Sequence, residues 1–160
     1  MTTQTTRPQF GRSRQAANSN GDGNNTHNRI LQSLPPRERD LVVPKLEFLR
    51  LTTHQILHEV PDTLKSGYFC DSGMISILSV FPDKKSVEVG LVGEEGFVGL
   101  PLIAGFRSAA TRAVVLIEAT AFRIEVATLI SLLRQCPTLN HLALRSRENF
   151  FLDIPFYRTH

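Results

Sequence analysis

Between residues 48 and 124 the sequence alternates short runs of strand-forming residues with turn signals, and this spacing constrains the fold most. The runs cover residues 48–51, 55–60, 67–70, 74–80, 86–92, 112–117 and 121–124. Turn-forming residues separate several of them, namely Pro61-Asp62, Asp71-Ser72-Gly73 and Phe81-Pro82-Asp83-Lys84-Lys85. Short strands at this spacing are typical of antiparallel rolls and sandwiches. The sequence therefore predicts a mainly β domain, an antiparallel β-roll of jelly-roll type, with a hairpin turn at residues 71–73.

Helical patterns flank these strands on both sides. Upstream, a short helix is predicted at residues 28–33, and Pro35-Pro36 ends it and begins a second helix, which Pro44 keeps short or broken. Downstream, an apolar stripe predicts a helix that Pro137 interrupts. Its members are Val126, Leu129, Ile130, Leu132 and Leu133. A last helix is expected from 138 to 147.

The two ends of the chain differ in character from the middle. Residues 1–27 are rich in polar residues and hold few large apolar side chains, so they predict a disordered tail. Residues 148–160 hold an aromatic cluster and no heptad pattern, and Pro155 stops any helix there. Two interpretations of this atypical tail stay open. It is the end of a truncated or frame-shifted gene, or it docks on the roll or on a partner.

Composition sets the broad class of the chain. With 160 residues, 41% of them hydrophobic, it has a one-domain length and needs no disulfide or metal to hold a core. Its net charge of +3 does not by itself indicate nucleic-acid binding. Cys70 and Cys136 are read as two unpaired thiols, and no run of 18 apolar residues occurs. A cytoplasmic protein is expected.

The stretch from Gly93 to Ser108 carries the strongest functional signal. A glycine-rich turn opens it, an apolar segment follows, and Arg107-Ser108 closes it. Glycines allow backbone N–H groups to surround a phosphate closely, and a guanidinium binds an anion through paired donors. This pattern favours a pocket for a small anionic ligand. Two loops flanking an apolar turn of a β protein remain the simpler alternative.

This stretch resembles the phosphate-binding cassette of the cyclic-nucleotide-binding domain in Crp/Fnr-type bacterial transcription regulators. Other segments resemble that family in the same order, over about residues 28–145. They are Asn28-Arg29-Ile30-Leu31 with Leu34-Pro35, Tyr68-Phe69 with Ser72-Gly73, Ser86-Val87-Glu88-Val89, and Gly93 through Pro101. The resemblance implies that residues 28–137 form the sensing roll and its flanking helices.

The resemblance also implies which residues bind a ligand. In the family a Gly-Glu pair starts the cassette helix, the Glu binds the ribose 2′-hydroxyl, and an Arg binds the cyclic phosphate. Gly99 and Arg107-Ser108 fit this pattern, whereas Leu100 stands where the Glu is expected. Losing a charged hydrogen bond forfeits about 1.5–3 kcal/mol. The predicted ligand-binding residues are therefore Gly99, Leu100, Arg107 and Ser108, in an altered or empty pocket.

The same family implies partners. A long helix after the roll pairs two subunits, and a helix-turn-helix domain then reads DNA. Here residues 138–147 are expected to begin a truncated dimerisation helix, with no DNA-binding domain after it. The expected partners are a second copy or a full-length relative in a mixed dimer, with a small anionic effector, and DNA only through the missing domain or a partner. No membrane partner is expected. The alternative is a protein-interaction module of the same roll fold that binds no nucleotide.

Signals for enzymatic or metal chemistry are weak. His54 and His58 are four residues apart beside Glu59, but no third ligand is near, so surface or edge histidines are favoured over zinc. The sequence has no Gly-x-Ser-x-Gly elbow, Walker loop or Cys-x-x-Cys motif. A cupin-like metal enzyme is thus the least favoured function. No enzyme activity, no metal and no cofactor are expected, and a cyclic mononucleotide is one candidate for the small anionic effector.

Overall fold

The computed structural model describes residues 25–146, so the predictions for residues 1–24 and for the tail at 148–160 lie outside its described part. Two short helices, α2 (Arg29–Gln32) and α3 (Pro36–Val42), and the 3-10 turn η3 (Val43–Lys45) come first. The strands are β1 (Glu47–Leu51), β2 (Ile56–His58), β3 (Ser66–Val80), β4 (Ser86–Val92), β5 (Phe97–Val98) and β6 (Arg112–Glu125). Helix α4 (Leu100–Ile103) lies between β5 and β6, and α5 (Val126–Gln135) and α6 (Pro137–Arg145) follow the sheet.

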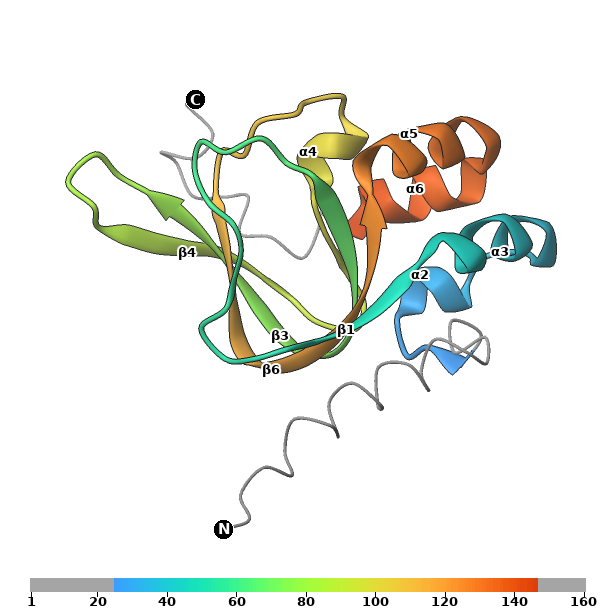
Figure 1. Cartoon of the computed structure of the whole chain (residues 1–160), viewed down its shortest axis with the longest axis horizontal. Helices are drawn as coiled ribbons and strands as arrows, with labels where there is room; N and C mark the ends of the chain where they lie inside the picture. The colour runs from blue at the N-terminus through green and yellow to red at the C-terminus, as the bar shows by residue number, and fades with distance from the viewer. Residues whose placement is uncertain (1–24, 147–160) are drawn as a thin grey trace, which may run out of the picture.

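The strands form one antiparallel sheet with the order β1-β6-β3-β4. Strand β2 also pairs with β6, and β5 pairs with β3. The two long strands, β3 and β6, make up the centre of the sheet and bend with it into a roll (Figure 1). The helices gather at one end of this roll, while the β3–β4 hairpin extends from the other end. The predicted mainly β fold with flanking helices is confirmed.

Two predicted breaks in the sheet are wrong. The hairpin turn expected at residues 71–73 is instead the middle of β3, which continues over 15 residues. The two strands expected at 112–117 and 121–124 are one strand, β6, of 14 residues. The pairing register between β3 and β6 shifts between Cys70 and Ser72, between Ser72 and Met74 and between Met74 and Ile75. Turn-forming residues therefore produce irregularities inside a long strand pair, because such residues suit bulges as well as turns.

Alternation along the strands divides the apolar side chains between two cores. One core fills the roll and holds Cys70 and Ala121, whereas the other lies between the roll and the helices and holds Phe69 and Phe122. Neighbouring residues of a strand point to opposite faces, so each central strand contributes to both cores. The helix-side core includes Leu102 from α4, Leu129 and Leu132 from α5, and Leu139 from α6. The cassette helix is thus packed in the same core as the two helices that follow the sheet.

The packed part of the chain begins earlier than the predicted end of the tail at residue 27. Thr26 is buried and its hydroxyl donates to Asp71 over 2.7 Å, and the backbone N–H of His27 donates to the same carboxylate over 2.6 Å. Asn28 is fully buried beside them. Residues 26–28 therefore fix the first described segment to strand β3.

Helix α3 is connected to α6 by a buried carboxylate, and this contact gives a first prediction. Glu38 is 4% exposed and accepts from the backbone N–H groups of Thr138 and Leu139, over 3.0 and 2.9 Å. Glu38→Ala leaves the first turn of α6 without these acceptors, so the free energy of unfolding should fall by about 2 kcal/mol in a urea titration. Glu38→Gln, which keeps one oxygen, should lose less.

Asp40 offers a matched control for this prediction, since it is an exposed carboxylate on the same helix. Asp40→Ala should change the free energy of unfolding by less than about 0.5 kcal/mol. Identical unfolding curves for Glu38→Ala and Asp40→Ala would contradict a capping role for Glu38.

Candidate functional site

The predicted cassette folds as a short strand, one turn of helix and a loop. Gly99 lies between β5 and α4 with φ of 119°, a left-handed conformation that favours glycine. A Cβ at this position would lie 3.2 Å from the Cα of Gly67, a tight contact, so the close approach of the two segments also favours glycine. The backbone N–H of Phe106 donates to the carbonyl of Pro101 over 2.8 Å and closes the loop after α4. The cassette is therefore a compact turn.

Leu100 occupies the first position of α4 and faces the helix-side core. Its side chain is half-buried and packs against the cluster that also holds Leu102 and Leu139. An apolar side chain in this position offers no acceptor to a ligand hydroxyl. The carboxylates of the preceding turn do not replace it. Glu94 lies 3.8 Å from the guanidinium of Arg29, and Glu95 accepts from the N–H of Gly93 over 3.3 Å.

Arg107 and Ser108 lie at the other end of the cassette, in an extended segment alongside residues 62–64. The N–H of Leu64 donates to the carbonyl of Arg107 over 2.7 Å, and Thr63 and Ser108 form an antiparallel bridge. Both residues are exposed. The guanidinium of Arg107 makes no hydrogen bond or ion pair with any residue between 25 and 146, so its donors are available to a ligand.

A hollow that the sequence did not predict lies beside this segment. It has a volume of about 530 Å³. It is lined by Leu57, His58, Asp62, Thr63, Lys65, Ser66, Tyr68 and Arg123. None of Gly99, Leu100, Arg107 and Ser108 contributes to it, although Thr63 touches both places. The predicted ligand-binding residues and this hollow are therefore two different places in the structure. Because the lining comes from β2, β3, β6 and a loop, no contiguous motif marks it in the sequence.

His58 is the unusual residue of this hollow. Its Nδ1 is buried and has no hydrogen-bond partner within the part of the chain that the structure describes. Burial lowers the pKa of His58, and the opposing effects of Glu59, a backbone hydrogen bond with Thr111 and Asp62 are smaller. The ring is therefore neutral at neutral pH. The neighbouring Glu59 has a lowered pKa because Arg112 donates to both of its oxygens, over 2.9 and 2.8 Å.

Tyr68 and Arg123 form the opposite wall. The pKa of Tyr68 is raised by burial, against a smaller opposing effect of Arg123, whose guanidinium donates to the Tyr68 oxygen. Arg123 also bonds to Glu47. The phenol is therefore protonated at neutral pH, and its O–H remains free to donate to a molecule in the hollow.

The residues considered for metal binding or redox chemistry do not form a cluster. His54 is exposed in a turn with φ of 75°, whereas His58 is half-buried in β2. Within residues 25–146 no group of three or more His, Cys, Asp or Glu side chains is placed to hold a metal ion. Cys70 and Cys136 are free, as predicted, and both are buried, which raises the pKa of Cys70 to about 12. Among the helices of residues 25–146, none is long and apolar enough to span a membrane.

Comparison with known proteins identifies the fold. No family model matches the sequence, and no curated protein matches it significantly. Solved structures do match. The catabolite activator protein of Thermus thermophilus aligns with a TM-score of 0.61 at 16% identity, over 71% of this chain and 53% of its own. The regulatory domain of Toxoplasma gondii PKA, solved with cAMP, aligns with a TM-score of 0.67 at 17% identity, over 86% of this chain and 52% of its own.

A third structure adds a separate sensor domain. The sensor domain of the transcriptional regulator DNR from Pseudomonas aeruginosa aligns with a TM-score of 0.60 at 13% identity, over 72% of this chain and 77% of its own. This chain thus spans about half the length of the Thermus protein and most of an isolated sensor domain. The chain has the fold of the cyclic-nucleotide-binding domains of such regulators, which confirms the resemblance at the level of the fold.

Proposed function

We propose that this chain is the effector-sensing domain of a Crp/Fnr-like transcription regulator whose cyclic-nucleotide pocket is altered. The observation that carries this proposal is the form of the cassette. Gly99 keeps the left-handed turn, and Leu100 turns an apolar side chain toward the core where the family has a ribose-binding Glu. The guanidinium of Arg107 has no partner among residues 25–146. The outline of an anion pocket is present, but its sugar contact is missing.

The packing also supports a route by which a ligand would act. Helix α4 contacts both α5 and α6, and Leu102 and Leu139 belong to one core. A ligand that shifts the cassette would move α4 and bias the position of α6, which takes the place of the start of the family's dimerisation helix. The proposed output is a change in how two copies, or a copy and a full-length relative, pair. DNA recognition then belongs to the partner or to a separate domain.

Restoring the missing carboxylate tests this function. Leu100→Glu should strengthen binding of cyclic AMP by about tenfold to a hundredfold in calorimetry, because it returns a charged acceptor for the ribose hydroxyl. Adding Arg107→Ala should remove that gain, since the phosphate loses its guanidinium. Leu100→Gln is the matched control of similar size and should gain less. Circular dichroism checks that each variant keeps its fold.

Two results would count against the proposal. One is a folded Leu100→Glu variant that shows no heat with cyclic AMP or cyclic GMP. The other is a gain that survives Arg107→Ala, because the ligand would then not use the cassette.

A protein-interaction module without nucleotide binding is the second candidate. It is favoured by large apolar side chains exposed on β2 and β6, since Ile56 is 51%, Leu116 47% and Ile117 55% exposed. Sedimentation of the full chain and of Ile117→Asp distinguishes the two. An oligomer lost in Ile117→Asp, together with no response to any cyclic nucleotide in Leu100→Glu, favours the interaction module.

A further inference from the structure

We propose that the hollow between β2, β3 and β6 is a second ligand site, separate from the cassette, for a small hydroxylated phosphomonoester. The site is defined by His58, Asp62, Lys65, Ser66 and Tyr68. This inference does not rest on the proposed function, because none of the cassette residues Gly99, Leu100, Arg107 and Ser108 lines the hollow.

The size of the hollow sets the size of its ligand. Its volume of about 530 Å³ lies within the range of small-molecule sites and exceeds the volume of an inorganic ion. It is lined by more polar than apolar side chains, with Leu57 as the one aliphatic residue. A compact molecule with many polar atoms fits this lining better than an apolar ligand or a bare ion.

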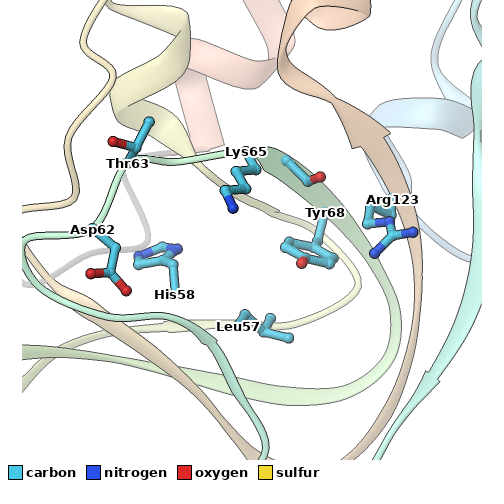
Figure 2. A pocket seen from close by; sticks show the side chains of 8 residues that line it. Leu57, His58, Asp62, Thr63, Lys65, Tyr68 and Arg123 are labelled. Atoms are coloured by element: carbon cyan, nitrogen blue, oxygen red, sulfur yellow. The ribbon is translucent and has the colours of Figure 1, made fainter.

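Donors for an anion gather at one end. Figure 2 shows the Lys65 ammonium reaching into the space between His58 and Tyr68, and Ser66 also lines the hollow. Lys65 makes no ion pair with any residue in the described range 25–146. The Tyr68 oxygen already accepts from Arg123, so its hydroxyl proton is left to donate. An ammonium and a phenol hydroxyl that approach from different directions, with the Ser66 hydroxyl in the same lining, suit a tetrahedral phosphate better than a planar carboxylate.

Acceptors lie at the opposite end. Figure 2 shows His58 and Asp62 side by side, away from Arg123. Nδ1 of His58 has no partner among the described residues. The hydrogen bond with the Thr111 backbone therefore involves Nε2, which carries the proton of the neutral ring. Nδ1 is therefore a buried acceptor without a donor. Because Nδ1 has almost no exposed surface, the ring has to turn toward the hollow before a ligand hydroxyl can donate to it, and Asp62 accepts from a second hydroxyl. The ligand thus needs hydroxyls some distance from its phosphate.

The test compares three probes by calorimetry and by amide chemical shifts at constant ionic strength. They are glycerol 3-phosphate, inorganic phosphate and glycerol. Glycerol 3-phosphate should bind more tightly than inorganic phosphate, and glycerol should not bind. Lys65→Gln should weaken both phosphates at least tenfold, because the charged donor is lost. His58→Leu should weaken glycerol 3-phosphate and leave inorganic phosphate unchanged, since only the acceptor for the hydroxyl is removed.

Controls place the ligand. Lys85→Gln removes the same charge in the exposed β3–β4 turn and should have no effect. Lys45 lines a neighbouring hollow that shares Lys65, Ser66 and Arg123, so Lys45→Gln should also leave binding intact. Arg107→Ala should not change the affinity for glycerol 3-phosphate. The amide chemical-shift changes caused by the ligand should be centred on residues 65–68.

The proposal is overturned by three results: no binding of either phosphate to the wild-type chain, equal binding by Lys65→Gln, or losses in Lys45→Gln or Arg107→Ala that match the loss in Lys65→Gln. The last result would move the ligand to the neighbouring hollow or to the cassette. His58→Leu replaces an unsatisfied buried nitrogen with an apolar group, so it should fold, and its melting temperature reports this independently.

Discussion

Asn28→Ala is expected to lower the free energy of unfolding by about 4 kcal/mol, because one fully buried side chain makes four hydrogen bonds. Its amide donates to the carbonyls of Cys70 and Gly96, over 2.7 and 2.9 Å. Its oxygen accepts from the N–H groups of Ile30 and Leu31 at the start of α2, over 3.1 and 3.2 Å. The substitution removes the amide donor from each of two buried carbonyls, although the Gly96 carbonyl still accepts from the N–H of Cys70 over 3.4 Å, and it removes the cap of α2. Urea denaturation followed by circular dichroism measures the loss.

A second variant, Asn28→Asp, distinguishes the capping of α2 from the donation to the two carbonyls. Asn28→Asp keeps the oxygen that caps α2 but replaces the donors with an oxygen facing the carbonyls of Cys70 and Gly96. At neutral pH it should be at least as destabilising as Asn28→Ala. The introduced carboxyl is disfavoured as an anion when folded, so its pKa rises. Its penalty, relative to the parent at each pH, should shrink as the pH falls from this raised pKa to the ordinary value of about 4, and should stay constant below it.

Asn25 provides the matched control for both variants, since it is an exposed asparagine three residues upstream. Asn25→Ala should leave the unfolding curve within about 0.5 kcal/mol of the parent. If Asn28→Ala costs no more than Asn25→Ala, the bonds to Cys70 and Gly96 do not stabilise the fold.

Asn28 also shows which features of the fold can be predicted from the sequence and which cannot. It was recognised as part of a helix start that resembles a family, and the helix is present at Arg29–Gln32. Its partners lie 42 and 68 residues away in sequence, and local patterns carry no information about contacts at that separation. The alternation of apolar residues was enough to predict the strands, because it depends only on neighbouring positions.

The two candidate sites differ in the same way. The cassette was predictable because Gly99, Leu100, Arg107 and Ser108 lie within ten residues and match a known motif. The hollow was not, because its residues run from Leu57 to Arg123 and meet only when β2, β3 and β6 are paired. For His58 the sequence favours a surface or edge position over a zinc ligand. The burial of its Nδ1, which has no hydrogen-bond partner among the described residues, depends on the tertiary packing and could not be inferred from the local sequence.

Gly73 marks the place where the sequence reading of the fold was wrong, and it gives the second large effect. It has φ of 83° in the middle of β3, where a turn was predicted. A Cβ there would lie 2.3 Å from the carbonyl oxygen of Glu118 and 2.6 Å from the Cα of Ala119, both in β6. Gly73→Ala is therefore expected to cost about 3–4 kcal/mol, of which about 1–2 is left-handed strain and the rest displacement of β6. Thermal unfolding measures the loss.

Gly105 separates the two contributions. It has φ of 93°, close to that of Gly73, but a Cβ there meets no atom within 4 Å. Gly105→Ala should cost only the left-handed strain, about 1–2 kcal/mol, and keep the cassette folded. A much larger loss at Gly73 than at Gly105 shows that the close contact of β3 with β6 at the register shifts requires glycine. Equal losses would mean that backbone conformation alone sets the cost, and that β6 yields to a methyl group without losing its pairing to β3.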